Sequence, residues 1–122
     1  MSKEIATKNA PAAVGPYSQA LEVGSLVFAS GQIPLDPATG TIVGETAAEQ
    51  AEQVFTNIEA VLKEAGLGMK DVVKSTVFLT DLNDFAAVNE VYAKHFVKPY
   101  PARSCVEISA LPKGAKDRKS VV

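Results

Sequence analysis

Arg103 and Cys105 lie two residues apart in segment 101–108 (Pro-Ala-Arg-Ser-Cys-Val-Glu-Ile), whose composition predicts a β-strand. Because side chains alternate along a strand, Val106 is expected to face the core, and Arg103, Cys105 and Glu107 the other side. A guanidinium among small neutral side chains can bind a carboxylate through two parallel hydrogen bonds. The segment therefore predicts a site for a small organic acid. The alternative is an edge-strand arginine paired with Glu107 or with solvent.

Other residues offer further polar groups for such a site, each with a simpler alternative. Cys105 could act as a thiolate nucleophile favoured by Arg103, or could be a small buried residue. Ser30 and Gly31 follow an apolar run, where a hydroxyl and free backbone amides could bind an oxyanion or merely form a turn. Tyr17 follows a rigid glycine–proline pair and could donate a phenolic hydrogen bond or cap the core.

The sequence offers little for metal or cofactor chemistry. His95 is the only histidine and Cys105 the only cysteine, so neither a metal site nor a Ser-His-Asp or Cys-His arrangement is indicated. A histidine near a helix C-terminus, favoured by the helix dipole, explains His95 better. The glycines are isolated and form no phosphate-binding loop. The sequence therefore predicts no metal and no organic cofactor.

Length and composition predict one globular domain over residues 1–122, with 47% hydrophobic and 21% charged residues. A net charge of −2 and a pI near 5.4 argue against a nucleic-acid partner, which would need clustered lysines and arginines. A single cysteine forms no internal disulfide and favours the reducing cytoplasm. No apolar run reaches the roughly 18 residues of a membrane span, so no membrane partner is expected.

The first half of the chain predicts a β-hairpin followed by a helix. Extended runs at 17–22 and 26–31 flank a Val-Gly-Ser turn, as in a hairpin. Thr46 begins a Thr-Ala-Ala-Glu capping box, after which apolar residues recur at helical spacing. Gly66 then supplies the left-handed residue that ends the helix.

The second half predicts a strand, a helix and the arginine strand. Residues 72–80 are rich in β-branched side chains, and Asp81 and Asp84 can cap a helix whose apolar stripe runs to Phe96. Two prolines follow and favour extended backbone. The whole pattern predicts an α+β fold in which two helices pack on one face of a sheet.

Several segments together carry a resemblance to a known family. They are 9–19 (Asn-Ala-Pro-Ala-Ala-Val-Gly-Pro-Tyr-Ser-Gln), 30–34 (Ser-Gly-Gln-Ile-Pro), 81–85 (Asp-Leu-Asn-Asp-Phe), 88–92 (Val-Asn-Glu-Val-Tyr) and 101–107 (Pro-Ala-Arg-Ser-Cys-Val-Glu). In this order the chain resembles the Rid family of reactive-intermediate deaminases, also called the YjgF family, without large gaps. The Arg-Ser-Cys-Val-Glu run is specific to its RidA branch.

The resemblance implies a chorismate-mutase-like fold, assembled as a homotrimer with a central barrel and pockets at the subunit interfaces. It also implies hydrolysis of 2-iminobutanoate and 2-iminopropanoate to the 2-oxo acid and ammonia. A small imino or oxo acid would be the ligand. Because imines hydrolyse readily, such a site needs mainly to position the reactants.

The resemblance also implies roles for particular residues. Arg103 would hold the substrate carboxylate, Tyr17 would orient the substrate or its attacking water, and Asn89 would complete the pocket across the interface. Cys105 would line the polar end of the pocket. The implied residues are Arg103, Tyr17 and Cys105 for catalysis, and Arg103, Ser30, Gly31 and Asn89 for substrate binding.

Residues 117–122 (Asp-Arg-Lys-Ser-Val-Val) depart from the family. Family members end in a strand that alternates valine or isoleucine with glutamate, and one glutamate is thought to position the water. Arg118 stands where that glutamate would be, and Asp117 would point to the opposite face. Four polar residues in place of an alternating strand predict lost apolar burial and an unpaired sheet edge.

Two explanations of this departure stay open: an altered reading frame, and a natural variant that binds 2-oxo acids but hydrolyses imines poorly. The leading functional prediction is an imine deaminase. The alternatives are a non-catalytic 2-oxo-acid-binding or regulatory protein, and a translation inhibitor of the endoribonuclease type. The last fits poorly with the acidic pI and the few aromatic residues.

Overall fold

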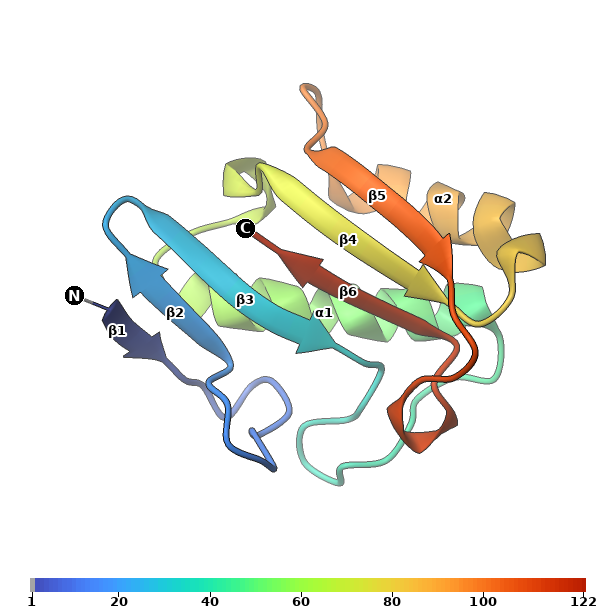
Figure 1. Cartoon of the computed structure of the whole chain (residues 1–122), viewed down its shortest axis with the longest axis horizontal. Coiled ribbons are helices and arrows are strands. Elements are labelled where there is room, and N and C mark those ends of the chain that lie inside the picture. The colour runs from blue at the N-terminus through green and yellow to red at the C-terminus, as the bar shows by residue number, and fades with distance from the viewer. Residues whose placement is uncertain (1) are drawn as a thin grey trace.

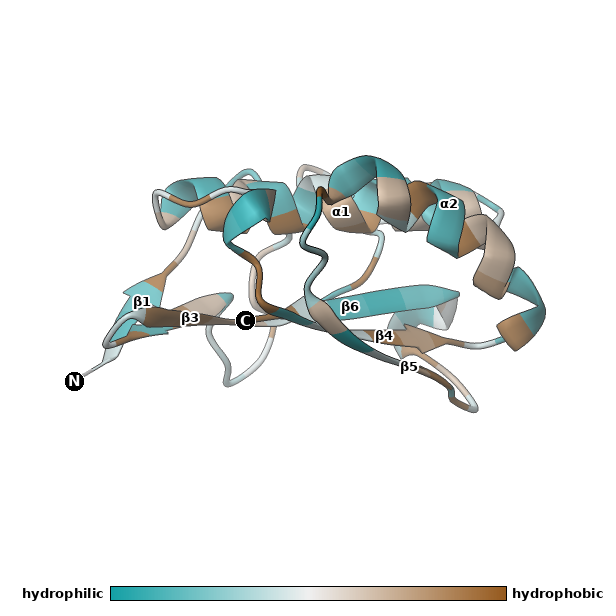
Figure 2. Ribbon diagram, turned by 90° about the horizontal axis from the view of Figure 1, so that it is seen from above, coloured by the Kyte–Doolittle hydropathy of each residue, from teal (hydrophilic) through white to brown (hydrophobic). Residues whose placement is uncertain are grey.

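The fold is a six-stranded mixed sheet with two α-helices on one face, as a computed structural model describing residues 2–122 shows (Figures 1 and 2). The sheet order is β1-β2-β3-β6-β4-β5, in which β4 and β5 are parallel and the other neighbours antiparallel. The elements are β1 (Ser2–Ile5), β2 (Ala20–Val23), β3 (Leu26–Gln32), α1 (Ala47–Glu64), β4 (Lys74–Leu79), α2 (Phe85–His95), β5 (Ala102–Glu107) and β6 (Asp117–Val121). The predicted α+β arrangement is confirmed.

Helix α1 begins and ends where the sequence predicts. Thr46 Oγ1 accepts a hydrogen bond from the Glu49 amide at 3.2 Å, and Glu49 Oε1 accepts one from the Thr46 amide at 3.1 Å. Gly66, just beyond the helix, has φ +78°, which L-residues rarely adopt. The apolar stripe of α1 includes Phe55 and Ile58, both buried against the sheet. Burial of each such side chain stabilises the fold by roughly 1.5–3 kcal/mol.

Helix α2 packs beside α1 on the same face of the sheet (Figure 2). Its buried residues Val88, Val91 and Tyr92 join the main hydrophobic core, and Phe96 follows directly after the helix. The Tyr92 hydroxyl lies 2.7 Å from Ser75 Oγ on β4, so the one buried phenol of this stripe has a polar partner. Among residues 2–122, no helix has the length and hydropathy needed to cross a membrane.

The predicted hairpin and strands are confirmed, and the structure adds two strands, one at an edge of the sheet and one in its middle. β2 and β3 form the hairpin, with Val23 opposite Leu26. β1 pairs with β2 at one edge, although its four residues show no apolar alternation. β6 is the second addition, and it lies in the middle of the sheet.

The position of β6 shows that the predicted unpaired edge is wrong. All five residues of β6 pair with β4, from Asp117 opposite Leu79 to Val121 opposite Ser75, and β3 pairs along its other side. Backbone amides and carbonyls form these ladders whatever the side chains are. A polar segment therefore occupies a central strand, which is teal in Figure 2.

The two charged side chains of β6 that face the helices form a buried ion pair. Asp117 and Lys119 are both 0% exposed, Lys119 Nζ donates to Asp117 Oδ2, and Nζ lies 4.8 Å from the Phe55 ring centroid. Asp117 Oδ1 has no hydrogen-bond partner among residues 2–122. Burial raises the pKa of Asp117 and lowers that of Lys119, while their mutual attraction opposes both shifts. Such a pair contributes little net stability.

The other face of the sheet carries apolar side chains that neither helix covers, and we call it the open face. Its large members, 37–47% exposed, are Leu21, Val23, Leu26, Phe28 and Val106. Figure 2 shows both helices on the opposite side of the sheet. Exposed apolar side chains gathered on one face of a sheet are typical of an interaction face.

Replacing the buried pair by apolar residues, Asp117→Ile with Lys119→Ile, is expected to stabilise the fold by about 1–4 kcal/mol, because two desolvated charges are removed. Lys119→Met alone is expected to destabilise it by about 3–5 kcal/mol, because it leaves the Asp117 carboxylate buried without a partner. Urea unfolding monitored by circular dichroism measures both changes. A double variant that unfolds at a lower urea concentration than the parent would show instead that the ion pair is a net source of stability.

Candidate functional site

Arg103 lies beside a pocket of about 330 Å³ on the helix side of the sheet edge, which we call the Arg103 pocket. Arg103 Nη1 donates to Asn89 Oδ1 on α2 at 2.6 Å, and the guanidinium carbon lies 4.8 Å from the Tyr92 ring centroid. Within residues 2–122, no carboxylate forms an ion pair with it. Since a guanidinium has five N–H donors and Arg103 is exposed, most of them are free to bind an anion.

The faces of β5 are the reverse of those predicted. Cys105 packs against the core, and Arg103 lies over α2, whereas Val106 is on the open face. The predicted alternation is correct, but the assignment of Val106 to the core is wrong, because α2 covers the side of β5 that carries the polar residues. The alternative pairing of Arg103 with Glu107 is also wrong, since Glu107 Oε1 accepts a hydrogen bond from the Leu82 amide at 2.9 Å.

Cys105 is half-buried on the same side of β5 as Arg103 and lies opposite Val77 of β4. Burial raises the pKa of the Cys105 thiol, and the positive charge of Arg103 offsets only part of that increase. A thiol with a raised pKa carries little thiolate at neutral pH. The environment therefore favours the small-residue alternative over the nucleophile.

A larger cavity of about 560 Å³ lies at the end of β3, and we call it the Gly31 pocket. Tyr17, which is 51% exposed, and Ser30 line it together with Gly31. The Ser30 amide donates to the Gln19 carbonyl at 2.9 Å, and its hydroxyl donates to the Ser18 carbonyl at 2.6 Å. The prediction of a free Ser30 amide is therefore wrong. The Ser30 hydroxyl can offer a ligand only its acceptor lone pairs.

Arg118 also lines the Gly31 pocket, from the open-face side of β6. Its side chain crosses Gly31 so closely that a Cβ there would lie 2.0 Å from Arg118 Nε, so a larger residue at position 31 would require the arginine to move. The guanidinium carbon lies 5.8 Å from the Phe78 ring centroid. Asp117, the neighbouring residue, points to the helix side, as strand alternation predicts.

Buried side-chain amides hold the loops that form the Gly31 pocket. Gln19 accepts from the Thr7 amide at 2.7 Å and donates to the Pro11 carbonyl at 2.7 Å, which fixes the loop that leads to Tyr17. Asn57 of α1 donates to the carbonyls of Ile33 and Leu35 at 3.2 and 3.0 Å. Sequence reasoning assigned no role to Gln19 or Asn57. A signal existed for Asn57, because it falls on the buried stripe of α1, where an unpaired amide would be costly.

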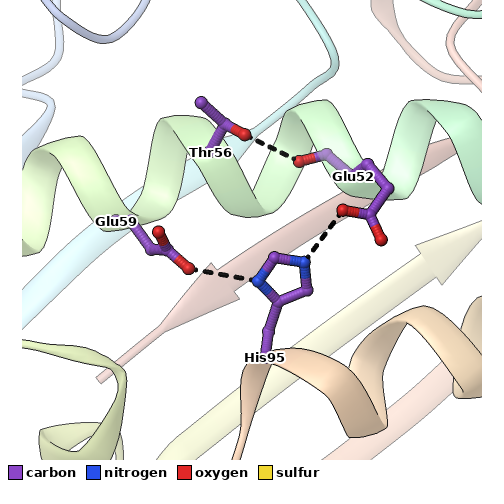
Figure 3. Close-up of polar contacts among 4 residues, drawn as sticks. All are labelled: Glu52, Thr56, Glu59 and His95. Carbon is purple, nitrogen blue, oxygen red and sulfur yellow. Dashed lines mark hydrogen bonds and ion pairs between the residues drawn. The ribbon is translucent and has the colours of Figure 1, made fainter.

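His95 links the two helices and lies apart from both pockets. Its Nε2 is 3.1 Å from Glu52 Oε2 and its Nδ1 is 3.1 Å from Glu59 Oε1, both on α1 (Figure 3). The ring stacks on Phe55 with centroids 4.4 Å apart. Since the two carboxylates lie on opposite ring nitrogens, they do not converge on a common point beside the imidazole. His95 is therefore placed as an interhelix contact at the end of α2.

The predicted site residues fall into two groups within one protomer. Arg103 and Asn89 form the Arg103 pocket, with Cys105 on the same face of β5. Tyr17, Ser30 and Gly31 belong to the Gly31 pocket, and the two pockets share no lining residue.

Comparisons with known proteins agree with this fold. The family model described as Endoribonuclease L-PSP matches residues 7–116. The RutC family protein y4sK of Sinorhizobium fredii is 56% identical over 116 residues, and a 2-iminobutanoate/2-iminopropanoate deaminase of Salmonella typhimurium is 53% identical over 119; each alignment covers 95% of this chain and 92% of the relative. The crystal structure of RidA from a Psychrobacter species superposes with a TM-score of 0.94 at 49% identity, covering 98% of this chain and 96% of that one. The resemblance predicted from the sequence is confirmed, and the chain belongs to the Rid family, also called the YjgF family.

Proposed function

We propose that this protein binds short 2-imino and 2-oxo acids and hydrolyses 2-iminobutanoate and 2-iminopropanoate to the 2-oxo acid and ammonia. Water adds to the imine carbon, and the C–N bond then breaks as the nitrogen leaves as ammonia. The observation that carries the proposal is the surroundings of Arg103. Its exposed guanidinium lies beside a pocket and is hydrogen-bonded to a neutral amide rather than to a carboxylate. The name of the Salmonella relative supports the same reaction.

In this proposal Arg103 binds the substrate carboxylate through two parallel hydrogen bonds. Each charge-assisted bond contributes roughly 1.5–3 kcal/mol. Asn89 orients the guanidinium by accepting one of its other N–H groups, at 2.6 Å. Tyr17 orients the substrate or its attacking water, while Cys105 lines the polar end of the site.

The complete site requires a second copy of the chain, which we propose is supplied by a homotrimer with a central barrel. Two observations support this assembly. The apolar open face is uncovered in one protomer. The Gly31 pocket, with Tyr17 and Ser30, is also separate from the Arg103 pocket of the same chain. Association of the open faces would bury the apolar surface and bring the Gly31 pocket of one copy toward the Arg103 pocket of a neighbouring copy.

A second candidate, a non-catalytic 2-oxo-acid-binding protein on the same scaffold, is favoured by β6. Arg118 occupies the pocket position at which the resemblance implies a water-positioning glutamate. Asp117 cannot replace that glutamate, because it is fully buried on the helix side and paired with Lys119. In this second candidate Arg103 still binds the carboxylate, while the position that would hold the water carries a positive charge in place of a negative one.

The proposed reaction is tested by generating imine with a threonine dehydratase and trapping it with semicarbazide. Added protein is expected to slow semicarbazone formation, and Arg103→Gln is expected to lower kcat/KM by about a hundredfold to ten-thousandfold through loss of two charge-assisted bonds. Lys94→Gln, an exposed residue of the same helix as Asn89, is the matched control and should leave the rate unchanged. A trapping rate that the protein does not alter would leave only the binding function.

Arg118→Glu is expected to raise the rate of imine hydrolysis by about tenfold to a hundredfold, because a carboxylate at this position can orient and deprotonate water. Arg118→Gln removes the positive charge without supplying a base, so it should give little of that gain. The same trapping assay measures both variants. Equal rates for the glutamate and glutamine variants would contradict a water-positioning role for this position.

Cys105→Ser is expected to retain turnover within about threefold, since a thiol whose pKa is raised by burial is a poor nucleophile at neutral pH. In the parent, iodoacetamide should alkylate Cys105 slowly at pH 7, and the rate should rise only above the pH at which an exposed thiol ionises. Mass spectrometry of the labelled protein follows the alkylation. A loss of turnover greater than a hundredfold in the serine variant would restore the nucleophile hypothesis.

A further inference from the structure

We propose that Arg118 makes the Gly31 pocket a binding site for a carboxylate, so that the assembled site prefers imino and oxo acids with a second, distal carboxylate over monocarboxylic ones. The inference rests on the proposed function, because it assigns the first carboxylate to Arg103. It concerns the substrate class of that site.

The surroundings of Arg118 leave its hydrogen-bond donors without protein partners. The guanidinium lies beside Gly31 and 5.8 Å from the centroid of the Phe78 ring, and within residues 2–122 its N–H groups donate no hydrogen bond to the protein. Within residues 2–122, Arg118 forms no ion pair. The donors of this half-buried guanidinium are therefore open to water or to a ligand, and a bound carboxylate would accept hydrogen bonds from two of them at once.

The charges around the pocket favour an anion. Lys113 lines the pocket with Arg118, and Asp36 is the acidic residue of the lining. Asp36 Oδ1 already accepts a hydrogen bond from the Ala38 amide at 2.8 Å, so this carboxylate is engaged in its own loop. Arg118 is therefore the group available to the ligand, with a second positive charge nearby.

The size of the cavity also suits a longer acid. At about 560 Å³ it falls in the range of pockets that take drug-sized ligands, roughly 300–1,000 Å³. A four-carbon monocarboxylic acid held by Arg103 would leave much of this space and the Arg118 donors empty. A site with a polar group positioned for one substrate discriminates against an analogue that lacks the matching group, because that polar group then stays unpaired.

The placement of the two arginines determines how such a ligand would lie. Arg103 is on the helix side of β5, and Arg118 is on the open-face side of β6, so the two cannot bind one small acid within a protomer. In the assembly proposed above, the Gly31 pocket of one copy adjoins the Arg103 pocket of the next. A dicarboxylic acid would then bind with one carboxylate on each arginine, and the reacting carbon between them.

Isothermal titration calorimetry of the parent protein with 2-oxobutanoate and with 2-oxopentanedioate tests the preference. The dicarboxylate is expected to bind about tenfold to a hundredfold more tightly, as one or two extra charge-assisted bonds would give. Equal affinities, or no binding of either acid, would overturn the inference. This comparison uses no variant and does not depend on how a substitution affects folding.

Arg118→Gln is expected to lower the affinity for 2-oxopentanedioate by about tenfold to a hundredfold and so to abolish the preference. Lys63→Gln, an exposed residue in the last turn of α1, changes the net charge by the same amount and should keep the preference. An Arg118→Gln variant that still prefers the dicarboxylate would overturn the assignment of Arg118.

Imine trapping with 2-iminobutanoate, measured separately, distinguishes this inference from the proposed function. Turnover without a dicarboxylate preference overturns the inference and leaves the proposed function standing. A dicarboxylate preference without turnover overturns the hydrolytic function and leaves Arg118 as the distal-carboxylate residue of a binding protein.

Discussion

The pairing of β6 with both β3 and β4 is the interaction on which the sheet depends. Without it, the β1-β2-β3 hairpin layer and the parallel β4-β5 pair would be separate sheets under two helices. The contact is also non-local, since Ala29 of β3 lies opposite Val121 at the other end of the chain. Loop-closure entropy opposes such long-range pairings, and a fold that depends on them folds more slowly than one built from local contacts.

The backbone of β6 carries this role with apolar support from only one of its side chains, Val121, which is buried in the main core. A strand covered by helices ordinarily buries apolar residues, whereas β6 buries Asp117 and Lys119. The pair is tolerated because the two opposite charges meet each other and the ammonium lies over the Phe55 ring. Apolar neighbours such as Val77 and Ile58 therefore supply the burial that β6 does not. The strand is held by its backbone pairing and its neighbours, and Val121 is its one apolar side chain in the core.

Local signals predicted most of the fold. The capping box at Thr46, the stop at Gly66 and the Val-Gly-Ser turn each specify backbone geometry directly, and all three were confirmed. The side-chain pattern of β6 does not predict a paired strand, because pairing of its backbone on both edges forms this strand. The faces of β5 were reversed because alternation gives two faces without saying which of them a helix covers. Val106 then looks like a core residue, although α2 lies on the side of Arg103.

The sequence predicts the residue types of the candidate site, but not that they are divided between two separate pockets of one protomer. Sequence motifs indicate that Arg103, Tyr17 and Ser30 serve one function, and they carry no information on which of them a single chain brings together. In the protomer the sheet separates Arg103 from the Gly31 pocket, so each pocket presents one arginine to an anion. The positive charges of the two arginines then favour a longer ligand. Two guanidiniums close to one carboxylate would repel each other, whereas guanidiniums at the two ends of a longer acid are each neutralised by their own partner.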